Sequence, residues 1–351
     1  MKLVAENISD YLSLIGFNDN KIISIRNLRN FCAKVGTNKG LVLVKQKGSN
    51  HSTFAKVSIH SELLFYKRIN DTVLASIKHL APLMFDINYQ HEILTIEFLD
   101  DYDNFNLVED FKNYKISTEL GKRVATLHNI QVATCTEEFG KVMSENYFRS
   151  FDIVTPESYN AGGPLFSKCI ELMQLYPDLN EGIESFRKEF KWDCFIHGDL
   201  KMDNILVKNS NNEIEIKFID WELVGIGDRY LDLGYIIGNY LLWWIEKMKF
   251  SEANESDNDE RMLIAKEHMF HFLAGYQSLL INKQKLNYLK LTRFTSIFLL
   301  NIFYSKSLFK NKYSKQDVMT LEIARKMLVV PEDIYPELFM KTIMQSYENT
   351  F

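Results

Sequence analysis

Residues 194–222 read CFIHGDLKMDNILVKNSNNEIEIKFIDWE, and this stretch decides the fold. Two apolar runs with strand character stand on either side of the Asn-rich turn at 209–212, so a hairpin of short strands is expected there. Around this island the sequence has helical periodicity, at 118–129, 166–176, 182–190 and in long runs after residue 260. The second part of the chain is therefore predicted to be a helical domain with one strand-bearing island.

The island holds acidic and amide residues at a spacing that suits phosphoryl transfer. That reaction needs a residue to orient the attacking hydroxyl and accept its proton, and ligands that hold Mg²⁺ on the phosphates. Asp199 and Asn204 have the spacing of the kinase pattern H-R-D-x-x-x-x-N, and Asp220 ends the strand that would return beside them. Ordinary turn or cap residues would explain one such Asp, but not all three in this order. His197 is expected to support the loop structurally.

The segments HGDLKMDNIL, FIDWE and DRYLDLG resemble the aminoglycoside phosphotransferase and choline kinase superfamily. The resemblance implies an α+β, protein-kinase-like bilobal fold, with a small antiparallel-sheet lobe carrying one helix and a larger helical lobe. It also implies ATP or GTP as donor, Asp199 as catalytic base, Asn204 and Asp220 as Mg²⁺ ligands, and Asp232 as a buried brace of the catalytic loop. Lys201 is a secondary candidate for reaching the transferred phosphoryl group.

The first hundred residues predict the smaller lobe. Strand-like runs occupy 22–46, a helix is expected from about residue 52, with Ser52 or Thr53 as its cap, and two more strands are expected within 79–87 and 91–99. The predicted nucleotide-binding lobe is 1–99, with a linker at about 95–102, and the catalytic and substrate-binding lobe is 103–351.

This lobe should supply a lysine for the nucleotide phosphates and a helix carboxylate that fixes it. Lys45 ends the apolar run LVLV, and Glu62 stands on the predicted helix, so these two are the expected pair. Lys47 and Lys56 are rivals. Solvated surface side chains are the structural alternative.

The linker TIEFLDD resembles the family's adenine-binding segment, which would place Glu97 and Leu99 beside the base. The sequence has neither G-x-G-x-x-G nor a P-loop, so residues 27–31 are the candidate phosphate-gripping loop. D-F-G and A-P-E are also missing, which argues against a regulated protein kinase and favours a small substrate.

Composition narrows the remaining possibilities. A formal net charge of −5 disfavours nucleic acid as a main partner. No apolar run is long enough to span a membrane and no export signal is visible, so a cytoplasmic location is expected. The protein is expected to be a monomer or a homodimer. The four dispersed cysteines are interpreted as reduced core thiols. Residues 251–260 are expected to form a surface loop, His268 and His271 to lie on a helix surface, and Trp243 and Trp244 to lie in the core.

The leading prediction is a small-molecule kinase that transfers the γ-phosphoryl of ATP or GTP to a hydroxyl group of a metabolite or antibiotic. The acidic residues Asp100, Asp101, Asp103 and Glu222 would suit a cationic acceptor such as an aminoglycoside, and solvation explains them equally well. A choline-like amino alcohol, methylthioribose and homoserine stay open as acceptors. The alternative from another class is an inactive nucleotide-binding pseudokinase that acts as a scaffold or sensor.

Overall fold

The computed structural model describes residues 1–27, 30–48, 59–70, 74–105, 113–135, 139–142, 163–210, 213–251, 255–281 and 285–348. They fall into two compact units, which are described separately. Unit 1 comprises Met1–Asn104 and Asp203–Val224, and unit 2 comprises Phe105–Met202 and Gly225–Phe351. Compactness thus groups 203–224 with the first unit, although the sequence assigned this segment to the second lobe. The assignment of functional domains stays a prediction.

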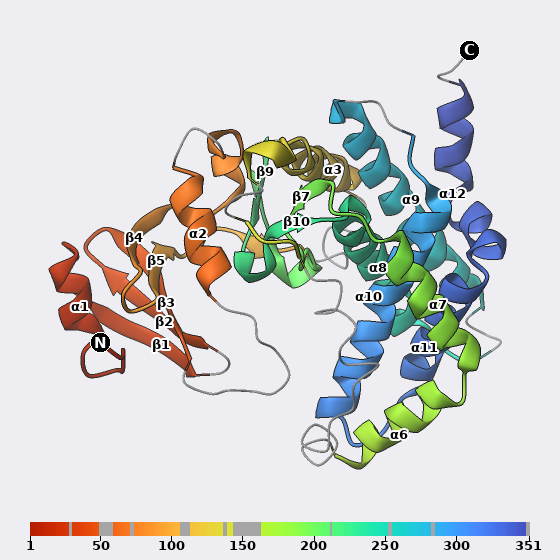
Figure 1. The fold of residues 1–351 in the computed structure, drawn as a ribbon, viewed down its shortest axis with the longest axis horizontal. Helices are drawn as coiled ribbons and strands as arrows, with labels where there is room; N and C mark the ends of the chain where they lie inside the picture. Colours follow the sequence, from red (N-terminus) through yellow and green to blue (C-terminus); the bar gives the residue numbers. More distant parts are fainter. Residues whose placement is uncertain are drawn as a thin grey trace. The chain divides into compact units, whose positions relative to one another are not determined.

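Unit 1 is built on a five-stranded antiparallel sheet with the order β1-β2-β3-β5-β4 (Figure 1). Its strands are β1 (Lys21–Asn27), β2 (Asn30–Thr37), β3 (Gly40–Lys47), β4 (Met84–Asn88) and β5 (Ile93–Glu97). Buried and half-buried residues alternate along β2, whereas β3 begins with the apolar run 41–44 and has three buried residues in succession at Val44, Lys45 and Gln46. The predicted meander of strands at 22–46 is confirmed.

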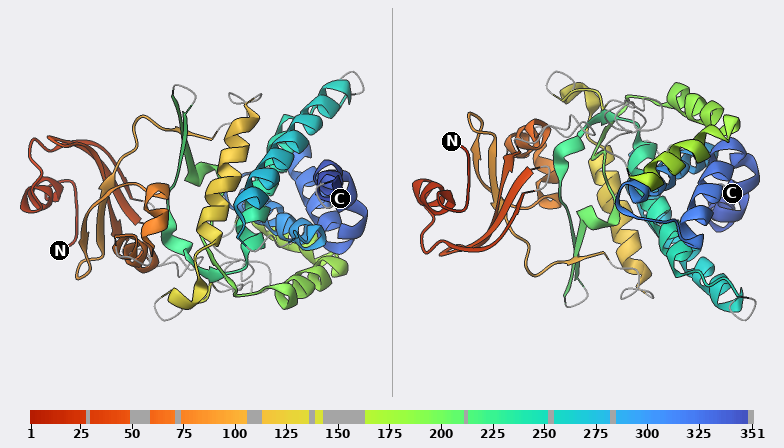
Figure 2. Two further views of the ribbon diagram at one scale, coloured as in Figure 1. Left: turned by 90° about the horizontal axis from the view of Figure 1, so that it is seen from above. Right: turned by 90° about the horizontal axis from the view of Figure 1, so that it is seen from below.

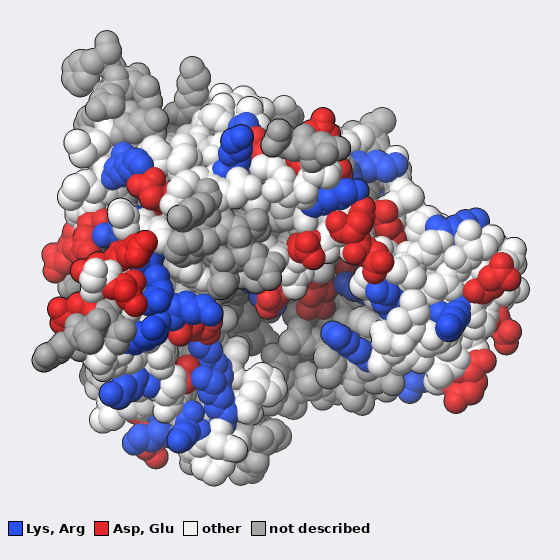
Figure 3. Space-filling model, turned by 180° about the vertical axis from the view of Figure 1, so that it is seen from behind, with Lys and Arg blue, Asp and Glu red and all other residues white. Residues whose placement is uncertain are grey.

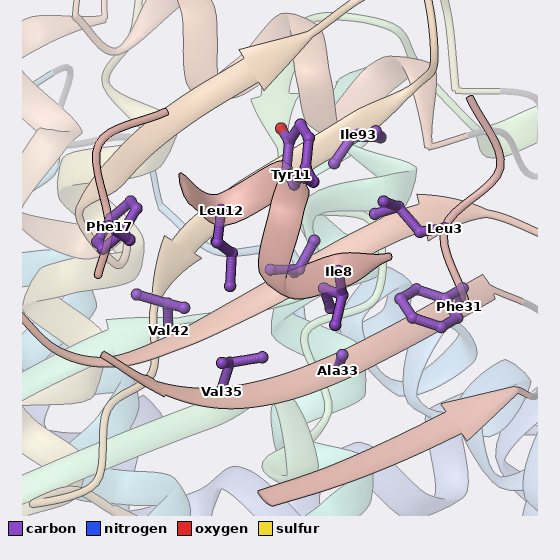
Figure 4. Packing of buried hydrophobic residues seen from close by; sticks show 11 residues of the cluster. Leu3, Ile8, Tyr11, Leu12, Phe17, Phe31, Ala33, Val35, Val42 and Ile93 are labelled. Carbon is purple, nitrogen blue, oxygen red and sulfur yellow. The ribbon is translucent and has the colours of Figure 1, made fainter. Parts of the chain in front are cut away.

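One face of this sheet is covered by the short helix α1 (Ile8–Leu14). Ile8, Tyr11 and Leu12 of the helix pack with Val35 and Val42 of the strands into one apolar cluster (Figure 4). Burial of these side chains is the main force that holds α1 on the sheet. Side chains on a strand alternate between faces, so Val44 faces this cluster while its neighbour Lys45 points to the opposite face.

The remaining elements of unit 1 complete the site described below. They are α2 (His60–Arg68), η1 (Ala75–Leu80), β6 (Asp103–Asn104), η3 (Met202–Asn204), β8 (Ile205–Ser210), β9 (Glu213–Phe218) and η4 (Trp221–Leu223). Strands β8 and β9 pair as the expected hairpin, and β6 adds to the edge of β8. The predicted helix is present from His60, whereas its expected cap at Ser52 or Thr53 lies outside the described residues.

Unit 2 is mainly helical (Figure 2). Its helices are α3 (Tyr114–His128), η2 (Val132–Thr134), α6 (Pro164–Gln174), α7 (Pro177–Glu189), α8 (Arg229–Lys247), α9 (Glu255–Leu279), α10 (Tyr288–Phe309), α11 (Lys315–Val329) and α12 (Pro331–Glu348). Two short antiparallel strands, β7 (Cys194–Ile196) and β10 (Gly225–Gly227), lie among them. An antiparallel sheet unit followed by a helical unit confirms the predicted α+β class.

Two glycines allow helices α3 and α9 of unit 2 to approach closely. A Cβ atom at Gly121 of α3 would lie 2.0 Å from the carbonyl oxygen of Phe272 in α9, and one at Gly275 of α9 would lie 2.1 Å from that of Thr118 in α3. Neither position has room for a side chain. The contact fixes α3 against α9, and both helices contribute to the polar network below.

Three expectations about unit 2 need correction. Residues 255–260 are the first turns of α9, because the acidic residues there suit a helix N-terminus, while 252–254 lie outside the described residues. His268 is 1% exposed, since its Nδ1 bonds the Ser117 hydroxyl at 2.8 Å and so tolerates burial. Trp243 and Trp244 are half-buried and not core residues.

All four cysteines are free thiols, as expected, and three of them are buried. Cys32 of unit 1 differs from the others in being only half-buried, so it is not a core residue.

The surface mixes charges of both signs. Figure 3 shows Lys and Arg side chains beside Asp and Glu side chains over much of one face. Exposed pairs such as Lys266–Glu337 and Lys341–Glu267 belong to this class, and screened surface pairs contribute little to stability. No helix in the described part of the chain combines the length and the apolar character needed to cross a bilayer.

Candidate active site

Lys45 lies at the centre of a charge cluster in unit 1, in which Lys45 and Glu62 are buried and the Asp220 side chain is 37% exposed. The Lys45 Nζ lies 2.8 Å from Glu62 Oε1, 3.1 Å from Glu62 Oε2 and 3.0 Å from Asp220 Oδ1. Burial alone would lower the pKa of Lys45, but the two carboxylates outweigh it and hold that pKa well above its ordinary value. Lys45 is therefore a fixed cation at neutral pH. Glu62 is 1% exposed, so it is no solvated surface residue.

Asp220 sits in a strained turn between β9 and η4. Its φ of 66° and ψ of 58° place it in the left-handed region, which non-glycine residues adopt at a cost. Neighbouring contacts hold the turn to α2. The Trp221 ring stacks on Phe65 at 3.9 Å, and the Trp221 backbone N–H donates to the Glu62 carboxylate. Such outliers often occur where a side chain must be aimed, and here Asp220 is aimed at Lys45.

Asn204 and Asp220 lie at the same end of the β8–β9 hairpin. Ile205 pairs with Phe218 in the ladder, and the Ile219 N–H donates to the Asn204 carbonyl oxygen at 3.0 Å. The two predicted metal ligands thus flank the last rung of an antiparallel ladder. A carboxylate and an amide supply hard oxygen ligands of the kind that Mg²⁺ binds, so these residues fit the predicted ion.

In unit 2, a tight turn presents Asp199. Gly198 has a φ of 85°, a conformation that suits glycine, and the backbone N–H groups of His197 and Gly198 donate to Asp232 at 2.8 and 2.9 Å. The Asp199 N–H lies 3.3 Å from His197 Nδ1. Asp232 and His197 therefore occupy the supporting positions expected from the sequence, although their functional roles stay predictions.

Asp232 is itself held by a histidine that the sequence analysis did not single out. His128 Nε2 lies 3.1 Å from Asp232 Oδ2, and His128 Nδ1 lies 3.0 Å from the Tyr276 hydroxyl. Burial would raise the pKa of Asp232, but His128, His197 and the backbone donors outweigh it, and the pKa lies below its ordinary value. The Leu-His ending of α3 was the available signal for His128.

Asp199 and Lys201 form a pair within the same turn. Lys201 Nζ lies 2.7 Å from Asp199 Oδ2, and both side chains are partly accessible, at 37% and 16% exposure. The side chains are thus accessible enough to meet a substrate, unlike those of Asp232 and His128.

The other predicted residues lie as follows. The Glu97 N–H and Phe98 N–H donate to the carbonyl oxygens of Leu83 and Leu41, and Leu99 is buried at 7% exposure. Contacts of Glu97 and Leu99 with adenine stay predictions. The rival Lys47 pairs with Glu92 at the surface, while Lys56 lies outside the described residues, as do residues 28 and 29 of the candidate phosphate loop.

Two of the four acidic residues that suggested a cationic acceptor are paired with lysines. Asp100 pairs with Lys34 at 3.1 Å, and Asp101 pairs with Lys208, which lowers the Asp101 pKa. These two carboxylates are therefore already neutralised within unit 1. They add nothing to the case for a cationic acceptor.

Residues 94–330, more than half of the chain, match the family model described as choline/ethanolamine kinase. The chain belongs to the choline/ethanolamine kinase family. The matched region contains Asp199, Asn204, Asp220 and Asp232, whereas Lys45 and Glu62 precede it. Membership of this family agrees with the superfamily resemblance found in the sequence, and the family consists of small-molecule phosphotransferases that act on hydroxyl groups.

Solved structures similar to this kinase-family chain support the same fold at low identity. The choline kinase LicA from Streptococcus pneumoniae is 14% identical, with a TM-score of 0.54 and coverage of 92% of this chain and 98% of its own. A choline/ethanolamine kinase family protein from Mesorhizobium loti is 11% identical, with a TM-score of 0.53 and coverage of 93% and 94%. An ethanolamine kinase from Plasmodium vivax is 18% identical, with a TM-score of 0.51 and coverage of 93% and 83%. A search of curated proteins gave no match.

Proposed function

We propose that this protein transfers the γ-phosphoryl group of ATP to the hydroxyl of a small amino alcohol such as choline or ethanolamine. The observation that carries the proposal is the buried Lys45 between Glu62 and Asp220, in a chain of the choline/ethanolamine kinase family. Structures with similar folds include LicA in complex with AMP, which supports an adenine nucleotide as donor. GTP stays an alternative donor.

In this mechanism each group has one task. Lys45 binds the α- and β-phosphates, and Glu62 holds Lys45 in place. Asp199 orients the acceptor hydroxyl and receives its proton as the oxygen attacks the γ-phosphorus, after which the bond from phosphorus to the β-bridging oxygen breaks and ADP leaves. Asn204 and Asp220 would hold Mg²⁺, which when bound neutralises charge on the phosphate oxygens.

The amino-alcohol acceptor is preferred to an aminoglycoside because the family match names choline and ethanolamine. Methylthioribose and homoserine lack such support. The pseudokinase alternative was motivated by an uncertain phosphate-binding lysine and a poor glycine loop. The intact buried Lys45–Glu62 pair supports an active enzyme over that alternative.

The test is ADP release by the purified protein with MgATP and a panel of choline, ethanolamine, aminopropanol, kanamycin, methylthioribose and homoserine. We expect turnover with at least one amino alcohol and a loss of about a thousandfold or more in Asp199→Asn, because this change removes the proton acceptor and keeps the shape. Glu213→Gln serves as a matched control, since Glu213 is exposed at the far end of the β8–β9 hairpin and has no role in the mechanism. An Asp199→Asn enzyme with undiminished turnover would contradict the proposal.

A further inference from the structure

Tyr66 is a buried residue of unit 1 whose hydroxyl group makes no hydrogen bond to the described part of the chain. The side chain is 0% exposed. A buried polar group without a partner destabilises a protein, and phenylalanine would fill nearly the same space without that cost. The hydroxyl therefore calls for a role outside simple packing.

The position of Tyr66 on α2 places it beside the Lys45 cluster. Tyr66 follows Glu62 by four residues, so the two side chains lie on the same face of the helix, one turn apart. Both are buried, and Glu62, Lys45 and Asp220 all act electrostatically on the Tyr66 hydroxyl, with Glu62 the strongest of the three. The hydroxyl and the Glu62 carboxylate are thus near neighbours that do not bond each other in this arrangement.

A count of donors shows when Glu62 would need another partner. The Lys45 ammonium has three N–H donors, and three contacts are made by it, two to Glu62 and one to Asp220. In the proposed function Lys45 must also bind phosphate oxygens. Each N–H that turns to a phosphate is withdrawn from a carboxylate. Glu62 then keeps the Trp221 backbone N–H as a donor, and at 1% exposure it has little access to water to replace the lost lysine contacts.

We propose that Tyr66 is a positioning residue: its hydroxyl donates to the Glu62 carboxylate when Lys45 turns toward the nucleotide phosphates. The bond would keep the buried Glu62 solvated by a protein group and so keep Lys45 in place. The inference rests on the proposed function and adds a residue that neither the sequence motifs nor the family match assigns. Tyr66 touches neither nucleotide nor acceptor in this role.

The test compares Tyr66→Phe with Tyr11→Phe, a matched control from the same unit. The Tyr11 hydroxyl bonds Asp86 Oδ2 at 2.8 Å, so its removal breaks a bond that already exists. Melting temperatures are measured with and without MgATP, and KM and kcat are measured for both substrates. Without nucleotide, we expect Tyr66→Phe to melt at or above the wild-type temperature and Tyr11→Phe to melt below it.

With MgATP we expect Tyr66→Phe, and not Tyr11→Phe, to be the impaired variant. Tyr66→Phe should show a smaller nucleotide-induced rise in melting temperature and a KM for MgATP raised about tenfold, with kcat and the acceptor KM nearly unchanged, whereas Tyr11→Phe should keep the wild-type values. A Tyr66→Phe protein with the wild-type rise and KM, or one that melts lower or fails to fold without nucleotide, would overturn the role of Tyr66. A wild-type protein that neither responds to MgATP nor turns over would instead overturn the proposed function and the inference with it.

Discussion

The two units hold their functional groups by different physical means. In unit 1, Lys45 contacts the carboxylates of both Glu62 and Asp220, so it keeps one charged partner when the other is removed. In unit 2, the Asp199 turn is fixed through its backbone, because the N–H groups of His197 and Gly198 bond the single carboxylate of Asp232. The comparison suggests that unit 1 is adapted to rearrange its charges and unit 2 to keep its turn rigid.

The largest effect is expected where the rigid arrangement is broken. Asp232→Ala leaves two buried N–H groups without their acceptor and His128 without its carboxylate, so the free energy of unfolding should fall by about 3–5 kcal/mol. Urea unfolding measures this value. Asp257→Ala, on the exposed start of α9, should change it by less than about 0.5 kcal/mol. A similar small change in both variants would remove the distinction drawn between the units.

A smaller loss is expected from the helix contact that supports Asp232 indirectly. Gly121→Ala forces a Cβ atom onto the backbone of α9, and overpacking of this kind costs about 1–3 kcal/mol or more. Gly140→Ala is the control, because a Cβ atom there meets no atom within 4 Å. Thermal melting of the two variants checks the prediction, and equal melting temperatures would contradict it.

In the Lys45 cluster we expect a substitution to affect the KM for MgATP more than the free energy of unfolding. Glu62→Gln leaves Lys45 paired with Asp220, so the free energy of unfolding should fall by only about 1–2 kcal/mol, less than in Asp232→Ala. The KM for MgATP should nevertheless rise by about tenfold or more, since the amide no longer fixes the lysine. Unfolding and steady-state assays on the same preparation test this. A Glu62→Gln protein as unstable as Asp232→Ala would contradict the difference drawn between the two units.

The smallest effects are expected from pH, and they should have opposite signs in the two units. The folded-state pKa of Asp232 is lowered, so its contribution to stability is full above the usual aspartate pKa of about 4 and is lost as pH falls through the lower folded value. The folded-state pKa of Lys45 is raised, so its contribution is full below the usual lysine pKa of about 10.4 and is lost as pH rises through the higher folded value.

Two variants test which residue causes the loss of stability at acid pH and which causes the loss at alkaline pH. Asp232→Asn should flatten the acid loss of stability and leave the alkaline one, and Lys45→Met should do the reverse, as measured by melting temperature from about pH 3 to 11. An acid limb that persists in Asp232→Asn would show that other carboxylates dominate it.

The sequence predicted elements well where local signals were strong. Alternating apolar residues indicated β2, a continuous apolar run indicated β3, and the Asn-rich turn indicated the β8–β9 hairpin. Lys45 and the predicted metal ligands Asn204 and Asp220 could therefore be named in advance. The Lys45–Glu62 contact also followed from element order, although the burial of Glu62 did not. A single sequence shows that a residue is on a helix but not which neighbours cover it.

The residues that were missed depend on contacts between distant elements. The Trp221 ring stacks on Phe65, which is far away in the sequence, and no local sequence pattern predicts this contact. His268 was expected at the surface because polar residues on a helix are usually exposed. Helix α9 packs against both α3 and α8, however, and His268 is buried. The start of α9 was missed because an acidic, polar segment has no apolar periodicity.

The composition of unit 1 from two separate chain segments has a consequence for biosynthesis. Residues 203–224 complete that unit, so while the polypeptide leaves the ribosome the first 104 residues wait for a partner that is translated about a hundred residues later. Until then Phe65 lacks the Trp221 ring and Lys45 lacks Asp220. The nascent sheet and α2 would emerge with an apolar face uncovered, and chaperones that bind exposed hydrophobic segments have their natural target there during this interval.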